Sequence, residues 1–231
     1  MKRWRRFGIV LLGLVGLALI GIFILVSLEP FPEKLRAGTP HASLRVFDRQ
    51  GRLLAEVTRE GERSGSVRLA ELPPHLVQAV LAAEDARFRS HPGVDVIAML
   101  RAAGQAVLAR RLVSGASTIT QQLARAVVER PRTLRGKLHE MIVALRIERE
   151  LDKDQILEAY LNYIEFGPRV RGLDAASRAY FDKPAARLDL AESALLVGLP
   201  RGPSLYDPTR GVERATRRRD RILERLHDAG D

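Results

Sequence analysis

The chain has 231 residues, no cysteine and a net charge of +10. The lack of cysteine excludes disulfides, thiolate metal sites and a cysteine nucleophile. The positive charge is concentrated, because residues 101–137 hold eight basic residues and one acidic residue, while the first six residues hold four basic ones. A basic segment of this strength favours a polyanionic ligand of the phosphate type.

A long apolar run follows the basic N-terminus. Residues 7–28 contain no charged residue, and at about 1.5 Å per residue a helix of this length spans the roughly 30 Å hydrocarbon core of a bilayer. The run is longer than a signal-peptide core and is not followed by a cleavage pattern, which favours an uncleaved membrane anchor over a buried core helix. Because basic flanks stay cytoplasmic, residues 1–6 are the expected cytoplasmic tail, and everything after Leu28 lies outside.

Residues 29–68 are expected to form a juxtamembrane linker and a small β-hairpin. The first part, residues 29–42, is rich in proline and glycine, which is typical of a linker. Residues 43–57 alternate apolar and polar residues on both sides of the sequence DRQG. This pattern predicts two strands joined by a turn.

The remainder, residues 69–231, is long enough for one domain with a sizeable core. Its apolar residues recur at helical spacing, which predicts helices over 74–86, 94–110, 117–128, 134–151, 153–164, 172–181, 189–199 and 211–228. Asp152 and Asp189 are the expected N-caps of two of these helices, and Glu192 completes a capping box with Asp189.

The first candidate motif is AAEDARFRSHPGVD, residues 82–95. Glu84 follows an apolar helical stretch, and apolar neighbours raise the pKa of a carboxylate, which suits it to general-base catalysis. Asp85 is expected to be the more solvated of the two. An exposed helix end followed by a turn also explains this motif, and the local residues alone favour that explanation.

The second candidate motif is SGASTITQQLARAVV, residues 114–128. Thr118, Gln121, Gln122 and Arg125 share one side of the predicted helix. Such a stripe of uncharged hydrogen-bonding groups with one cation suits a surface that binds sugar hydroxyls and phosphate, and a helix N-terminus attracts phosphate. An N-capped surface helix explains the pattern equally well.

The third candidate motif lies in residues 132–167, where the predicted helix 134–151 is apolar on two sides and therefore central to its domain. Glu140 lies on one of these sides, where an unpaired carboxylate is costly. Lys137, one turn earlier, is placed to pair with it. Glu140 is therefore either a buried salt-bridge partner, which the pattern favours, or a functional carboxylate.

Together, these blocks resemble the peptidoglycan glycosyltransferase family, which comprises the transglycosylase domains of bifunctional penicillin-binding proteins and the monofunctional peptidoglycan transglycosylases. The family pattern E-D-x-x-F-x-x-H-x-G is matched by Glu84, Asp85, Phe88, His91 and Gly93. The pattern G-x-S-T-I-T-Q-Q-L is matched without a gap over residues 115–123. K-x-x-E is matched by Lys137 and Glu140, and I-L-E-x-Y-L-N by residues 156–162.

Two later blocks, residues 175–184 and 192–208, also fit, so the resemblance covers roughly residues 69–226. The chain departs from the family where Arg125 and Ala126 replace the usual Lys-Asn, and where Gly136 replaces an arginine. The run RPRTLRGKL is most similar to the type 1C branch of the penicillin-binding proteins. The sequence lacks the S-x-x-K and K-[ST]-G motifs of the serine acyltransferases, which indicates a monofunctional relative or a fragment of a longer protein.

The resemblance implies a mainly α, two-lobed and lysozyme-like glycosyltransferase domain over residues 69–231, with a small β-hairpin and one N-terminal transmembrane helix. It implies a single-pass protein of the inner membrane with its catalytic domain outside. The implied reaction polymerises lipid II into glycan strands by inverting β-1,4 transfer and releases undecaprenyl pyrophosphate. The implied partners are lipid II, the growing strand, membrane lipids and other cell-wall synthesis proteins, with no nucleic acid.

The resemblance also assigns roles to residues, with Glu84 as the catalytic base. Glu140 orients the cations that stabilise the leaving pyrophosphate. The residues expected to bind the substrate and its pyrophosphate are Ser117, Thr118, Gln121, Gln122, Arg125, Arg135 and Lys137. The residues expected to support the base are Asp85, Phe88, His91 and Gly93. No cofactor is required, and the alternative is a divalent cation, Mg²⁺ or Mn²⁺, held by Glu140.

Two rival functions remain open. A membrane-bound lytic muramidase would use Glu84 as a general acid, but a hydrolase has no pyrophosphate for the basic segment to hold. A non-enzymatic cell-wall scaffold would be favoured by the loss of Glu84 or Glu140, and both residues are present.

Overall fold

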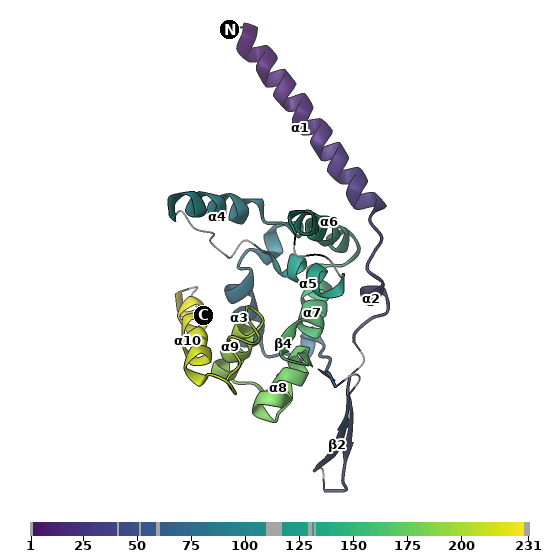
Figure 1. Cartoon of the computed structure of the whole chain (residues 1–231), viewed down its shortest axis with the longest axis vertical. Coiled ribbons are helices and arrows are strands. Elements are labelled where there is room, and N and C mark those ends of the chain that lie inside the picture. The colour runs from purple at the N-terminus through teal and green to yellow at the C-terminus, as the bar shows by residue number, and fades with distance from the viewer. Residues whose placement is uncertain are drawn as a thin grey trace.

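The computed structural model describes residues 2–40, 42–50, 52–58, 61–109, 117–128, 131 and 133–228. The described residues are mainly helical and form two small sheets (Figure 1). The helices are α1 (Lys2–Leu28), α2 (Glu33–Arg36), α3 (Pro74–Glu84), α4 (Val96–Ala109), α5 (Ile119–Val127), α6 (Leu134–Glu150), α7 (Lys153–Tyr163), α8 (Leu173–Phe181), α9 (Leu190–Gly198) and α10 (Val212–Asp228). Short 3₁₀ turns lie at Leu69–Glu71, Phe88–Ser90 and Ala185–Arg187.

Helices α3 to α10 confirm the eight predicted helices, and their ends follow from local chemistry. The helix predicted to reach residue 86 ends at Glu84, because Asp85 has extended φ of −161°. The helix predicted from residue 94 begins at Val96. Asp95 precedes it, and its carboxylate accepts a hydrogen bond from a backbone N–H of the first turn. The predicted capping boxes and N-caps of α7 and α9 are present.

The domain core joins two groups of helices. Helix α3 packs with α9 and α10, and α5 packs with α6 and α7, an arrangement visible in Figure 1. One continuous cluster of buried apolar side chains runs through both groups. Its fully buried members include Leu76, Ile119, Ile147, Leu161 and Leu196. The end of α3 meets the start of α5, where the two groups adjoin.

The predicted hairpin is confirmed by strands β1 (Leu44–Phe47) and β2 (Leu53–Val57), which pair antiparallel. The Asp48 carboxylate closes the turn by accepting hydrogen bonds from the backbone N–H groups of Gln50 and Arg52 at 2.9 and 2.8 Å.

A second sheet was not predicted. It contains β3 (Arg63–Ser64), β4 (Glu165–Gly167) and β5 (Val170–Arg171), in the order β3-β5-β4. Strands of two or three residues are too short to show an alternating pattern. The pairing of β3 with β5 joins the end of the hairpin region to the connection between α7 and α8.

Helix α1 is continuous over 27 residues. No helix within the described residues is both long enough and apolar enough to cross a membrane, so the structure does not support the transmembrane helix predicted over residues 7–28. The side chains of residues 1–12 and Val15 lie outside the described part of the chain.

The C-terminal end of α1 rests on α6. Glu29 and His139 Nε2 are 2.8 Å apart, and Arg149 Nη1 donates a hydrogen bond to Ser27 Oγ at 2.9 Å. The guanidinium of Arg149 also lies over the ring of Phe23, 5.3 Å from its centroid. These contacts fix the direction in which α1 leaves the domain.

Candidate active site

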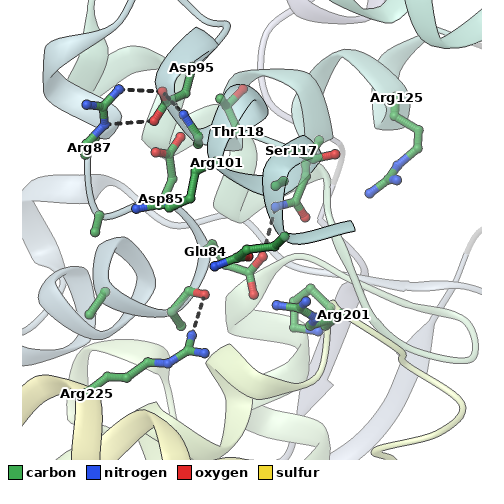
Figure 2. Close-up of a pocket in the computed structure, with 18 residues that line it drawn as sticks. Glu84, Asp85, Arg87, Asp95, Arg101, Ser117, Thr118, Arg125, Arg201 and Arg225 are labelled. Carbon is green, nitrogen blue, oxygen red and sulfur yellow. Dashed lines mark hydrogen bonds and ion pairs between the residues drawn. The ribbon is translucent and has the colours of Figure 1, made fainter. Parts of the chain in front are cut away.

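A pocket of about 500 Å³ opens where α3 ends. Residues from α3, α4, α5 and α10 line it, together with the segment that follows α9. Its lining includes five arginines, Arg87, Arg101, Arg125, Arg201 and Arg225. Figure 2 shows Glu84 in the middle of this arrangement. The pocket therefore combines a central carboxylate, Glu84, with five arginines, and Asp85 and Asp95 also belong to its lining.

Glu84 is the last residue of α3, and its side chain is only 7% exposed. Gln122 Nε2, from α5, donates a hydrogen bond to Glu84 Oε2 at 2.9 Å. Burial raises the pKa of Glu84, whereas the Gln122 hydrogen bond and the charges of Arg218, Arg201 and Arg225 oppose this rise. The desolvation predicted for Glu84 is confirmed, and a raised pKa makes a carboxylate a stronger base.

Asp85 is not the more solvated neighbour, and that prediction was wrong. Its side chain is 5% exposed, no more than that of Glu84. Asp85 lies 3.0–3.1 Å from His91 Nε2 and accepts a hydrogen bond from the backbone N–H of Ile119 at 3.1 Å. The chain after α3 folds back onto the start of α5, so Asp85 is enclosed and links the two helices.

Gly93 and His91 complete this link. The backbone N–H of Gly93 donates to His91 Nδ1 at 3.2 Å, and Thr118 Oγ1 donates to the Gly93 carbonyl at 2.6 Å. Gly93 has φ of +90°, and a Cβ placed on it would lie 3.0 Å from the Ala144 carbonyl oxygen of α6. Only glycine fits this position without strain. Phe88, the remaining matched residue of the first motif, is fully buried in the core.

Thr118 and Gln121 form a reciprocal capping box at the start of α5. Thr118 Oγ1 accepts from the Gln121 backbone at 3.1 Å, and Gln121 Oε1 accepts from the Thr118 backbone at 3.2 Å. Thr118 also lines the pocket beside Ser117 and Gln122, while Gln121 does not. The N-capped helix, which was one of the two explanations of this motif, is therefore present. It turns Gln122 toward Glu84.

Glu140 is a buried salt-bridge partner, as the sequence pattern favoured. It is 2% exposed and pairs with Lys137. Lys137 Nζ also donates to Ser117 Oγ at 3.1 Å and to Gln121 Oε1 at 3.4 Å. Neither Glu140 nor Lys137 lines the pocket, and Arg135 is an exposed residue that does not line it either. The catalytic and binding roles predicted for all three stay predictions.

The basic segment reaches the pocket through Arg101 and Arg125. Its other members Arg110, Arg111, Arg130 and Arg132 lie outside the described residues, as do Ser114 and Gly115 of the second motif.

The sequence did not predict the cations that α10 and the segment after α9 bring to the pocket. Arg201 follows α9, and Arg218 and Arg225 lie on α10. Arg218 is 4% exposed, and its Nη2 is 3.7 Å from Glu84 Oε1. Burial lowers the pKa of Arg218, and the nearby Glu84 carboxylate opposes that shift. The spacing of Arg218, Ile222 and Arg225 on one helix was the available signal, since Ile222 is buried in the core.

Within the described residues, the carboxylates placed to bind a metal ion already have partners. Asp85, His91 and Asp95 lie within 4.8 Å of one another and are buried. However, Asp85 is bound to His91, and Asp95 forms an ion pair with Arg87, whose Nε donates to Oδ2 at 2.9 Å. The Arg87 charge would repel a second cation here. Glu140 has the Lys137 ammonium as its partner, which disfavours a cation there too.

Comparison with known proteins shows to which family this chain is similar. A family model described as transglycosylase matches residues 50–227. Penicillin-binding protein 1A of Pseudomonas aeruginosa is 40% identical over 219 residues, which cover 94% of this chain and 26% of that protein. Penicillin-binding protein 1A of Escherichia coli strain K12 is 43% identical over 188 residues, covering 81% and 22%.

A similar protein from Aquifex aeolicus, also penicillin-binding protein 1A, is 40% identical over 224 residues, covering 96% of this chain and 30% of that protein. A crystal structure of penicillin-binding protein 1A from Haemophilus influenzae aligns with 83% of this chain and 19% of its own, at 25% identity and a TM-score of 0.47. The relatives named here are of type 1A, and the type 1C assignment stays a prediction.

The chain spans less than a third of the length of these relatives. The family model matches well over half of this chain. The chain therefore belongs to the transglycosylase family.

Proposed function

We propose that this chain polymerises lipid II into the glycan strands of peptidoglycan, with Glu84 as the catalytic base. The observation that carries the proposal is a desolvated carboxylate at the centre of a pocket lined by five arginines. Membership of the transglycosylase family supports the reaction type. The alternatives from the sequence are weaker because neither explains why a sugar-binding pocket needs so many cations.

In the proposed step, Glu84 takes the proton from the 4-hydroxyl group of the acceptor sugar. The hydroxyl oxygen forms a bond to the anomeric carbon of the growing strand, while the bond from that carbon to the lipid pyrophosphate breaks. The α linkage is thereby inverted to β. Gln122 holds one oxygen of Glu84 at 2.9 Å and fixes the direction of the carboxylate.

The leaving pyrophosphate is already a stable anion, so it needs positive charge more than a general acid. Arg101 and Arg125 line the pocket and are exposed to it. Arginine suits this task because its planar guanidinium binds phosphate oxygens through two parallel hydrogen bonds. Lys137 has a positioning role instead, because its ammonium group already binds Glu140 and Ser117. This proposal requires no cofactor.

The proposed site lies at the outer face of the inner membrane, where the lipid tails of both substrates enter. Residues 7–28 are the proposed anchor, on the strength of their uninterrupted apolar sequence. Helix α4 supports this placement with Val96, Ile97 and Leu100, which are 60–68% exposed. Figure 1 shows α4 and α6 on the side of the domain from which α1 extends. The two helical groups are the proposed lobes of a lysozyme-like domain.

Incubation of the purified chain with lipid II tests the proposal. The wild type is expected to form glycan polymer and to release undecaprenyl pyrophosphate. Glu84→Gln is expected to lower the rate by at least about 100-fold, the usual contribution of a general base. Glu224→Gln, an exposed change on α10, is the matched control and should leave the rate unchanged. A chelator should change the wild-type rate by less than about twofold, since the cations of the proposed site belong to arginine.

Equal rates for the wild type and Glu84→Gln would sink the assignment of the base. If the wild type instead shortened preformed strands, the muramidase alternative would replace the proposal. A wild type that neither builds nor shortens strands would favour the scaffold.

A further inference from the structure

Arg218 occupies a position of α10 at which the helix is otherwise apolar. The buried residues of this helix are Ala215, Arg218, Ile222 and Leu226, which recur at helical spacing and therefore share one face. An arginine in such a row is unusual, because burying a guanidinium group without a partner is costly. Arg218 is only 4% exposed, so its burial needs a compensating interaction.

Gly198 of α9 provides the space for this side chain. A Cβ at Gly198 would lie 2.8 Å from Cγ of Arg218 and 3.4 Å from Cδ1 of Ile222. The stem of Arg218 therefore lies against a position that has no side chain of its own. Helix α10 also packs against α3, and this places the guanidinium group next to Glu84, the last residue of α3.

Glu84 is the counter-ion of this buried cation. Nη2 of Arg218 lies 3.7 Å from Oε1 of Glu84, and the two side chains are 5% and 7% exposed. Within the part of the chain that the structure describes, Nε and Nη2 of Arg218 and Oε1 of Glu84 are buried without a hydrogen bond. A distance of 3.7 Å is too long for a hydrogen bond, so this contact acts through charge.

The two oxygens of Glu84 therefore have different neighbours. Oε2 accepts the hydrogen bond from Gln122 at 2.9 Å, which sets the direction of the carboxylate. Oε1 faces the charge of Arg218. A carboxylate that is buried without a cation nearby takes up a proton at higher pH than usual, and once protonated it cannot act as a base. An adjacent cation counteracts this effect of burial.

Other charged and titratable groups around Glu84 and Arg218 come from several elements. They are Asp85 beside the base, Arg125 on α5, Tyr160 on α7, Arg201 and Tyr206 after α9, and Arg225 on α10. Asp85 is paired with His91. Tyr160 is 2% exposed, and burial raises its pKa, so it is uncharged at neutral pH. The groups that share the positive sign of Arg218 are therefore the three arginines.

These three arginines differ from Arg218 in their access to substrate. Arg125, Arg201 and Arg225 are exposed and line the pocket, so an anion that enters the pocket competes with Glu84 for their charge. Arg218 is buried and is not part of the pocket lining. Its charge therefore stays with Glu84 when the pocket is filled.

We propose that Arg218 is a positioning residue that keeps Glu84 ionised from beneath the pocket, where a substrate anion does not reach it. This role rests on the proposed function of Glu84 as the base, and it requires no contact between Arg218 and the substrate. Gln122 sets the direction of the carboxylate, and Arg218 sets its charge. After each transfer Glu84 carries the proton of the acceptor, and Arg218 lacks its counter-ion, so the pair also favours loss of that proton to water.

The pH dependence of polymerisation tests this role. Arg218→Met keeps an apolar stem and removes the charge, so the pKa of Glu84 should rise. A cation at this range lowers the pKa of a carboxylate by about 1–3 units. The acid limb of kcat/KM, which is its rise with pH, should therefore move to higher pH by at least about one unit. The plateau above the limb should stay within about threefold of the wild-type value, because Gln122 still directs the carboxylate.

Arg218→Lys and Arg221→Met are the matched variants. Arg218→Lys restores a positive charge and should bring the acid limb to within about half a unit of the wild type. Arg221 is an exposed arginine on the same helix that does not line the pocket, and Arg221→Met should change neither limb nor plateau. An acid limb that stays at the wild-type pH in Arg218→Met would overturn the proposal, because a merely structural role lowers the plateau alone.

Titration of the Glu84 carboxyl carbon by carbon NMR on the full chain separates this inference from the proposed function. The loss of one signal in Glu84→Gln assigns it. The pKa of Glu84 should be at least about one unit higher in Arg218→Met, and in the second neutral variant Arg218→Gln, than in the wild type or Arg221→Met. Equal pKa values would overturn the role of Arg218 even if the wild type polymerises lipid II. The expected shift in a chain that forms no polymer would sink only the proposed function.

Discussion

The two walls of the pocket differ in the burial and bonding of their polar side chains. On the wall formed by the end of α3 and the start of α5, polar side chains are buried and hydrogen-bonded. Asp85 pairs with His91, and Thr118 donates to the Gly93 carbonyl. On the wall formed by α9 and α10, Arg201 and Arg225 are exposed to the pocket in an excess of like charge. The first wall holds the base in place, and the second presents charge to a ligand. Changes to the first should therefore cost stability, whereas changes to the second should cost binding.

The largest expected loss of stability is at Gly93. Gly93→Ala forces a side chain into a backbone with φ of +90° and places its Cβ 3.0 Å from the Ala144 carbonyl oxygen. We expect the free energy of unfolding to fall by about 3 kcal/mol, from backbone strain and overpacking together. Urea unfolding measures this loss of free energy. Gly104→Ala is the control, since a Cβ there meets nothing within 4 Å, and it should stabilise α4 by about 0.5–1 kcal/mol.

A smaller loss is expected at Lys137, beneath the first wall. Lys137→Ala leaves Glu140 buried without this partner and frees Ser117. Since Lys137 is about a third exposed, we expect a loss of about 2 kcal/mol, less than the full cost of breaking a buried pair. Arg135→Ala, an exposed change on the same helix, should cost less than about 0.5 kcal/mol. Equal effects of the two changes in thermal unfolding would contradict the positioning role of Lys137.

Gln122 tests how the first wall tunes the base. Gln122→Ala removes the hydrogen bond to Glu84 Oε2, which lowers the pKa of Glu84 in the native protein. The pKa of Glu84 should therefore rise further, and the polymerisation rate should fall about 10-fold as the carboxylate loses its fixed direction. Gln105→Ala, which also lines the pocket, should change the rate by less than about twofold. A smaller effect for Gln122→Ala than for Gln105→Ala would refute this role.

The smallest effect on stability is expected from the second wall. Arg225→Gln removes one of several like charges and only one long hydrogen bond. The free energy of unfolding should change by less than about 0.5 kcal/mol, as for most exposed substitutions. A destabilisation comparable to that of Gly93→Ala would show that Arg225 is structural, and the contrast between the walls would fail.

The contrast also explains what could be predicted from the sequence. The helices were predictable because α3 to α10 carry apolar residues at helical spacing and begin at capping residues such as Asp152 and Asp189. Glu84 and Gln122 were predictable because they belong to contiguous motifs. The three-stranded sheet was not, because β3 pairs with β5 across about 100 positions and all three strands are too short to show a pattern.

Sequence motifs did not predict the second wall, because only tertiary packing brings its arginines to the pocket. Helix α10 packs against α3, which brings Arg218 and Arg225 to Glu84 from more than 130 residues away. The roles expected for Arg135 and Lys137 at the pyrophosphate stay predictions. Lys137 pairs with Glu140, as its spacing indicated, and neither Arg135 nor Lys137 lines the pocket. Local sequence predicted charge and helices, and tertiary packing decided which charges line the pocket.

The central claim is that Glu84 works as the base, and the pH dependence of undecaprenyl pyrophosphate release tests it most directly. A base acts in its deprotonated form, so the rate of the wild type should rise with pH through the pKa of Glu84 and then level off. Because burial raises this pKa above its ordinary value of 4.5, the rise should lie above that value, and the residual rate of Glu84→Gln should lack it. An unchanged acid limb in Glu84→Gln would contradict the account.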